Sequence, residues 1–196
     1  MTQASRRVRS MIVTALAGTV LGGCGLVSGD DRREEPRVDF TMKEAAEKAD
    51  AMLDATMAAY VPEIEWTYDQ TTVGTCDLSR YRTVMTIVSE GRRGNFLGVT
   101  ERAWKKSGYA IVSVNDDKEH PAIFARSAEG FSISVVFGDR GQAFFEVATP
   151  CAQQSEVPDP AVRALGQDYS NSEVPYPNVR SAFWSAGAPG ERAVGG

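Results

Sequence analysis

The chain has 196 residues, a formal net charge of −5 and an apolar fraction of 42%. This length suits one domain of ordinary size, and the apolar fraction is too high for a wholly disordered chain. The acidic balance argues against nucleic acid as a partner, because that binding needs clustered positive charge. One histidine excludes a histidine-rich metal site, and three cysteines are too few for a disulfide-dense miniprotein.

The first 24 residues have the layout of an export signal. The basic segment Ser5–Arg9 precedes an apolar run over residues 11–20, which is about half the length of a bilayer-spanning helix. The run Leu21-Gly22-Gly23-Cys24 resembles the lipobox of bacterial lipoproteins. In that family the signal is cut before the cysteine, and two acyl chains hold the protein on the membrane.

This resemblance implies a signal peptide over residues 1–23, lipidation of Cys24 and a location on the extracytoplasmic face of the cell membrane. A plain secretory signal with an incidental cysteine is the alternative, and Sec and twin-arginine export both stay open. Three of the 21 basic residues and none of the 26 acidic ones lie in residues 1–23, so the mature chain carries −8. Residues 24–40 are polar and aperiodic, which predicts a flexible tether.

A helix followed by two strands is expected next. Thr41 and Glu44 form a capping box, and apolar residues at helical spacing behind it predict a helix over residues 41–60. Alternation over residues 64–68 predicts a strand, and the β-branched run over residues 81–88 predicts a second one. Gly91–Gly94 should end that strand, so we expect a second helix to begin at Asn95 and end at Gly108.

Only strands are expected after this helix, over residues 109–114, 122–125, 131–137 and 142–148, with a hairpin turn between the last two. The order predicts an α+β domain over residues 41–151, in which two helices pack on one face of a mostly antiparallel sheet of about five to six strands. Residues 152–196 carry five of the nine prolines and end in a glycine-rich run. We expect a largely mobile C-terminal tail.

Two cysteines remain after lipidation of Cys24. Cys76 follows the first expected strand, Cys151 follows the last, and export would place both in an oxidising compartment. A disulfide would close a loop of about 75 residues and stabilise the fold by roughly 4 kcal/mol at most. The alternative is a free or catalytic thiol, for which His120 is the only available base.

Several landmarks are similar to those of small secreted actinobacterial lipoproteins, in outline the mycobacterial LppA-type lipoproteins. They are residues 61–66 (VPEIEW), Cys76-Asp77, residues 104–109 (WKKSGY) and Thr149-Pro150-Cys151. The resemblance implies a lipid anchor at Cys24 and a bridge between Cys76 and Cys151, and it implies no reaction.

Three features of the sequence are candidates for functional sites. Arg92 and Arg93 precede the expected helix start, where a small anion would find backbone N–H groups, although a plain connection fits as well. Residues 115–120 (NDDKEH) gather metal-ligand types without a recognised spacing, so a solvated turn is expected there. Trp66, Trp104, Phe124, Phe131 and Phe145 fit core positions better than an aromatic platform.

No catalytic, metal or cofactor site stands out. A serine nucleophile would depend on His120, and no pair of acidic residues is distinguished. The leading hypothesis is a lipid-anchored, non-enzymatic interaction module that contacts another envelope protein. A carrier of a small ligand between sheet and helices and an envelope enzyme are the two alternatives.

Overall fold

The computed structural model describes residues 40–169 and 172–189. The expected signal peptide, Cys24 and residues 25–39 of the tether lie outside the described residues. The elements in chain order are α1 (Met42–Met57), β1 (Trp66–Tyr68), β2 (Thr72–Val73), β3 (Leu78–Val84), α2 (Glu90–Lys106), β4 (Ala110–Asn115), β5 (Ala122–Arg126), β6 (Ser132–Phe137), the 3-10 turn η1 (Asp139–Gly141) and β7 (Ala143–Ala148).

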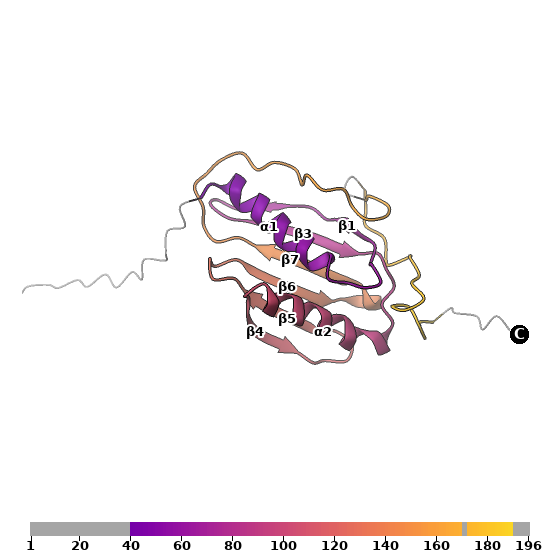
Figure 1. The fold of residues 1–196 in the computed structure, drawn as a ribbon. Helices are drawn as coiled ribbons and strands as arrows, with labels where there is room; N and C mark the ends of the chain where they lie inside the picture. Colours follow the sequence, from indigo (N-terminus) through magenta and orange to yellow (C-terminus); the bar gives the residue numbers. More distant parts are fainter. Residues whose placement is uncertain (1–39, 170–171, 190–196) are drawn as a thin grey trace, which may run out of the picture. The chain divides into compact units, whose positions relative to one another are not determined.

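The strands form one antiparallel sheet in the order β1-β3-β7-β6-β5-β4, and the short β2 pairs with β3. Both helices lie on the same face of this sheet, with α1 over β3 and β7 and α2 over β4 and β5 (Figure 1). The expected α+β class is confirmed. In the described part of the chain, neither helix has the length and apolar character that crossing a bilayer requires.

The start of α1 follows the predicted capping box. The Thr41 amide donates to Oε2 of Glu44 at 2.8 Å, and the Glu44 amide donates to Oγ1 of Thr41 at 3.3 Å. The Thr41 hydroxyl also donates to Oε2 of Glu44 at 2.9 Å, and the hydrogen bonds from the Thr41 amide and hydroxyl lower the pKa of the Glu44 carboxyl. The buried face of the helix is mostly small or apolar, which lets it pack closely on the sheet, and consists of Met42, Ala45, Ala46, Ala49, Met52, Leu53, Thr56 and Met57.

The second helix begins earlier than predicted. It starts at Glu90 with Ser89 as N-cap, so Gly91–Gly94 lie inside the helix instead of ending the preceding strand, which stops at Val84. A glycine costs a helix about 1 kcal/mol relative to alanine. Tertiary contacts of this first turn offset that cost, since Ser89 donates its amide to the Trp184 carbonyl at 2.9 Å.

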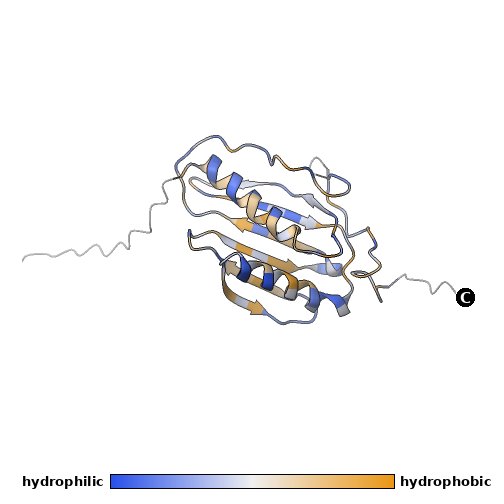
Figure 2. Ribbon diagram, in the orientation of Figure 1, coloured by the Kyte–Doolittle hydropathy of each residue, from blue (hydrophilic) through white to orange (hydrophobic). Residues whose placement is uncertain are grey.

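An aromatic cluster fills the layer between the sheet and the helices. Phe96 of α2 lies against Tyr60, Phe137, Phe145 and Trp184, with ring centroids between 4.3 and 6.0 Å apart. In Figure 2 the hydrophobic colours run along β6 and β7, whereas the outward turns of both helices are hydrophilic. This pattern is that of a sheet with one buried face and amphipathic helices above it.

The C-terminal segment corrects the expectation of a largely mobile tail. Trp184 is 1% exposed and donates its indole N–H to the Pro62 carbonyl at 2.7 Å, and the Val179 carbonyl accepts from the Ile87 amide at 2.8 Å. Leu165 forms a bridge with Trp66 at the edge of β1. A buried tryptophan contributes enough apolar area to fix a segment that has little secondary structure. Residues 190–196 lie outside the described part.

Candidate functional site

The strands present alternate residues to the two faces of the sheet. On β7, Phe145 and Val147 are buried beneath the helices, so Phe144 and Glu146 point to the opposite face. Cross-strand pairing extends this face from β3 to β5, through Tyr81, Glu146, Ser134 and Phe124. We call it the uncovered face, because both helices lie on the other side (Figure 1).

A hydrogen-bonded group lies at the centre of the uncovered face. Oε1 of Glu146 accepts from the Ser79 hydroxyl at 2.9 Å and from the Tyr81 hydroxyl at 3.1 Å. The two exposed rings of this face are Phe124 and Phe144, which are 38% and 37% exposed. The face therefore combines apolar rings with a fixed carboxylate.

The C-terminal segment borders one end of the uncovered face. The Tyr169 amide donates to Oγ1 of Thr67 at 2.8 Å, and the Gln142 side chain donates to the Pro175 carbonyl at 2.9 Å. We call residue 169 together with residues 172–176 the C-terminal wall. Between this wall and the ends of β1 and β7 lies a cleft of about 1150 Å³.

Aromatic and acidic residues line this cleft. Phe144 belongs to the sheet, whereas Tyr169 and Tyr176 belong to the C-terminal wall. The carboxylates that line it are those of Asp69, Asp139 and Glu173. This lining offers a ligand both aromatic rings and carboxylates, and the carboxylates come from three separate segments of the chain.

The opposite side of the sheet holds two buried arginines. Arg82 is 0% exposed, lies 4.0 Å above the Trp66 ring and pairs with Oδ1 of Asp54 at 2.5 Å. Nε of Arg80 lies 3.5 Å from Oδ2 of Asp50. Burial raises the pKa of the Asp50 carboxyl, against the opposing effect of both arginines. These pairs connect α1 to β3.

The alternative function, a carrier of a small ligand, requires a cavity in the layer between the sheet and the helices. Trp104 is 1% exposed and donates to Oγ1 of Thr56 at 3.0 Å, so its surroundings are packed. A pocket of about 420 Å³ lies beside Trp66 at the end of α1, and its lining includes Glu63 and Arg163. The lining of this pocket therefore includes acidic and basic side chains, unlike an apolar cavity for a small ligand.

Arg92 and Arg93 do not converge on one site. The Arg92 guanidinium lies 4.2 Å above the Phe183 ring. The Arg93 guanidinium donates to the Lys118 and Glu119 carbonyls at 3.3 and 2.9 Å. Both residues lie inside α2, and their side chains are used in packing, so the structure gives no support to the expected anion site.

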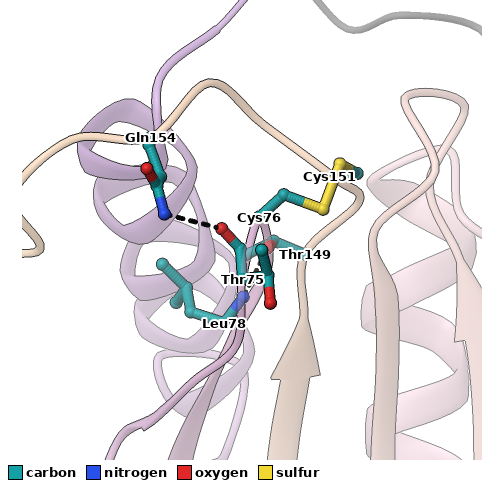
Figure 3. Close-up of a disulfide and its surroundings, with 6 residues drawn as sticks. All are labelled: Thr75, Cys76, Leu78, Thr149, Cys151 and Gln154. Atoms are coloured by element: carbon teal, nitrogen blue, oxygen red, sulfur yellow. Dashed lines mark hydrogen bonds between the residues drawn. A yellow bond between two sulfur atoms is a disulfide. The ribbon is translucent and has the colours of Figure 1, made fainter.

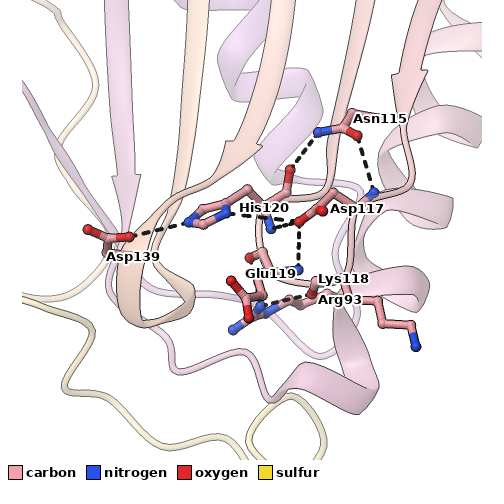
Figure 4. Close-up of polar contacts among 7 residues, drawn as sticks. All are labelled: Arg93, Asn115, Asp117, Lys118, Glu119, His120 and Asp139. Carbon is pink, nitrogen blue, oxygen red and sulfur yellow. Dashed lines mark hydrogen bonds and ion pairs between the residues drawn. The ribbon is translucent and has the colours of Figure 1, made fainter.

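The loop over residues 115–120 is held by its own polar groups (Figure 4). Oδ1 of Asp117 accepts from the amides of Glu119 and His120, both at 2.8 Å, which lowers the pKa of the Asp117 carboxyl. The His120 ring lies 3.3 Å from Asp139 through Nε2. Across the described residues, no three His, Cys, Asp or Glu side chains are grouped so as to hold a metal ion.

Cys76 and Cys151 are joined by a disulfide (Figure 3). Their Cα atoms are 4.8 Å apart, within the usual range for such bonds. Hydrogen bonds on both sides fix the same junction, from the Leu78 amide to Oγ1 of Thr149 at 3.0 Å and from the Gln154 side chain to the Thr75 carbonyl at 3.3 Å. The bridge fastens the beginning of β3 to the end of β7.

The predicted aromatic core residues divide between the two faces. Trp66, Trp104, Phe131 and Phe145 are buried as expected, whereas Phe124 is on the uncovered face. Sequence reasoning missed Phe144 and the C-terminal wall. The alternation of residues 142–148 would have placed Phe144 opposite Phe145, but the packing of the wall has no periodic signal.

Comparison with protein-family models finds no match, and comparison with curated proteins finds no relative. Among solved structures, a DUF4853 family protein from Actinomyces odontolyticus ATCC 17982 is 13% identical, with a TM-score of 0.37 over 68% of this chain and 83% of that chain. A glyoxylase/bleomycin resistance protein/dioxygenase domain from Frankia sp. EAN1pec is 12% identical, with a TM-score of 0.26 over 53% and 96%. At these TM-scores neither likeness carries an argument about function.

Proposed function

We propose that this protein is a lipid-anchored, extracytoplasmic binding protein of the cell envelope, which uses the uncovered face to hold another envelope component without converting it. The order of basic segment, apolar run and Leu21-Gly22-Gly23-Cys24 supports the anchor. One observation carries the binding role: both helices lie on one face of the sheet, and the other face has a cleft of about 1150 Å³.

The anchor is tested by fractionation of cells that express Cys24→Ser or, as a matched control, Ser28→Ala. We expect the control to stay with the membrane and the Cys24→Ser protein to leave it, because two acyl chains supply the binding energy. Membrane retention of the Cys24→Ser protein would contradict the anchor.

The binding role is tested by photo-crosslinking in intact cells. A photoreactive amino acid replaces Phe144 on the uncovered face or, as the control, Ala55 on the outer surface of α1, both of which are exposed. We expect a discrete adduct from position 144 alone. Adducts from position 55 alone, from both positions or from neither would contradict the proposed use of the uncovered face.

A further inference from the structure

We infer that the cleft beside the C-terminal wall takes an extended basic segment of a partner protein, with lysine or arginine side chains held between carboxylates and aromatic rings. This inference rests on the proposed binding function and specifies the chemistry of the partner. It is carried by the charge, the rings and the size of the cleft.

The charge of the cleft is of one sign. Asp69, Asp139 and Glu173 line it, and no lysine or arginine is among the described residues that do so. A cleft with one sign of charge concentrates the field and attracts counter-ions of the opposite sign. The Arg140 guanidinium belongs to the same turn as Asp139, and the His120 ring lies 3.3 Å from Asp139 through Nε2.

The Asp69 carboxylate retains acceptor capacity. Its Oδ1 accepts from the Gln70 amide at 2.7 Å, and from the described part of the chain its Oδ2 receives only a long contact of 3.4 Å from the Thr83 hydroxyl. A carboxylate has about four lone-pair positions, so an incoming ammonium or guanidinium finds acceptors there.

The rings of the cleft are suited to the same ligand. The Arg140 guanidinium lies 4.0 Å from the centre of the Tyr176 ring, so one aromatic side chain of the wall already holds a cation from the chain itself. Phe144 and Tyr169 also line the cleft. A cation over such a ring is attracted by the electrostatic quadrupole of the ring, and more strongly when the cation is desolvated.

The size of the cleft favours a chain segment over a small amine. Its volume of about 1150 Å³ exceeds the roughly 300–1000 Å³ of ordinary small-molecule pockets. The cleft is lined by residues of the sheet and of the C-terminal wall. A segment with alternating basic residues would reach the carboxylates on both sides.

The test measures binding of three fluorescent eight-residue peptides to the full chain. One peptide alternates lysine with glycine, one replaces lysine by glutamine and one replaces it by glutamate; free lysine amide serves as a competitor. The variant Asp69→Asn/Asp139→Asn/Glu173→Gln removes the charge of the cleft. The control Asp116→Asn/Glu156→Gln/Asp159→Asn makes the same change in net charge at exposed residues outside the cleft.

We expect the lysine peptide to bind about tenfold more tightly than the glutamine peptide, and the cleft variant to lose about tenfold, because three exposed charge contacts contribute about 1.4 kcal/mol together. The control should stay within about twofold of the unaltered chain. Phe144→Leu, which keeps all charges and leaves the pair of Arg140 and Tyr176 in place, should weaken the lysine peptide several-fold.

Equal loss in the control, equal binding of the glutamine peptide or tight binding of free lysine amide would overturn the inference. If the neutral peptide binds and position 144 still yields its adduct, the basic partner is wrong while the binding function stands. If position 144 yields no adduct, the proposed function itself fails.

Discussion

The two faces of the sheet are built from the same strands, but different groups lie against them. Beneath the helices lie the aromatic cluster around Phe96 and the buried pair of Arg82 and Asp54. The uncovered face presents Phe144 and the carboxylate of Glu146. We infer that the covered face supplies stability and the uncovered face is available for binding, so substitutions on the two faces should have separable effects.

The largest effect is expected from Trp184→Ala. Trp184 is 1% exposed and fixes the C-terminal segment to the covered side of the sheet. Its removal leaves a cavity and should lower the free energy of unfolding by about 4 kcal/mol. Denaturant unfolding measures this loss. A loss below about 1 kcal/mol would mean that the C-terminal segment is not part of the folded core.

Loss of the disulfide should have the next largest effect. The double variant Cys76→Ser/Cys151→Ser opens a loop of 75 residues and should lower the free energy of unfolding by about 3 kcal/mol. Unfolding of the oxidised and reduced unaltered chain provides the control. Two free thiols in the untreated protein, detected by mass mapping, would contradict the bridge.

Asp54→Ala should destabilise the covered face by about 2 kcal/mol, because it leaves the buried Arg82 without its anionic partner. The side chain of Asp54 is 35% exposed, which lowers the expected loss below that of a fully buried pair. Glu47→Ala, which breaks an exposed pair with Lys43 at 4.0 Å on the same helix, is the matched control. It should cost less than about 0.5 kcal/mol.

Phe144→Ala should lower the free energy of unfolding by about 1 kcal/mol, well below the loss for Trp184→Ala, because its ring is 37% exposed and no helix covers it. The same substitution should weaken binding of the lysine peptide. A loss comparable to that of Trp184→Ala would remove the distinction between the two faces.

The smallest effect is a pH dependence from Asp50. Burial raises the pKa of this carboxyl in the folded state, so the folded state binds the proton more readily than the unfolded state. Its contribution to stability is therefore present at low pH and lost as the pH rises from the ordinary value of 3.8 through the raised one. The unaltered chain should lose stability relative to Asp50→Asn over this window, as measured by denaturant unfolding; a relative gain would contradict the burial of Asp50.

Much of the fold was predictable because its signals are local. The capping box at Thr41 and the alternation of β6 and β7 depend on residues close in sequence. The predicted start of α2 was wrong because the first turn of the helix is held by a distant contact, from the Ser89 amide to the Trp184 carbonyl nearly a hundred residues away, which has no local sequence signal. The cleft was not predictable for the same reason, since Asp69, Asp139 and Glu173 meet only after β1, η1 and the C-terminal wall have assembled.

The most direct test of the central claim is nuclear magnetic resonance mapping of the lysine–glycine peptide on the full chain. The account predicts that shift changes concentrate at Asp69, Phe144 and Tyr176, and that Ala55 on α1 and Arg102 on α2 stay unchanged. Shift changes centred on the helices, with none at the cleft, would contradict it.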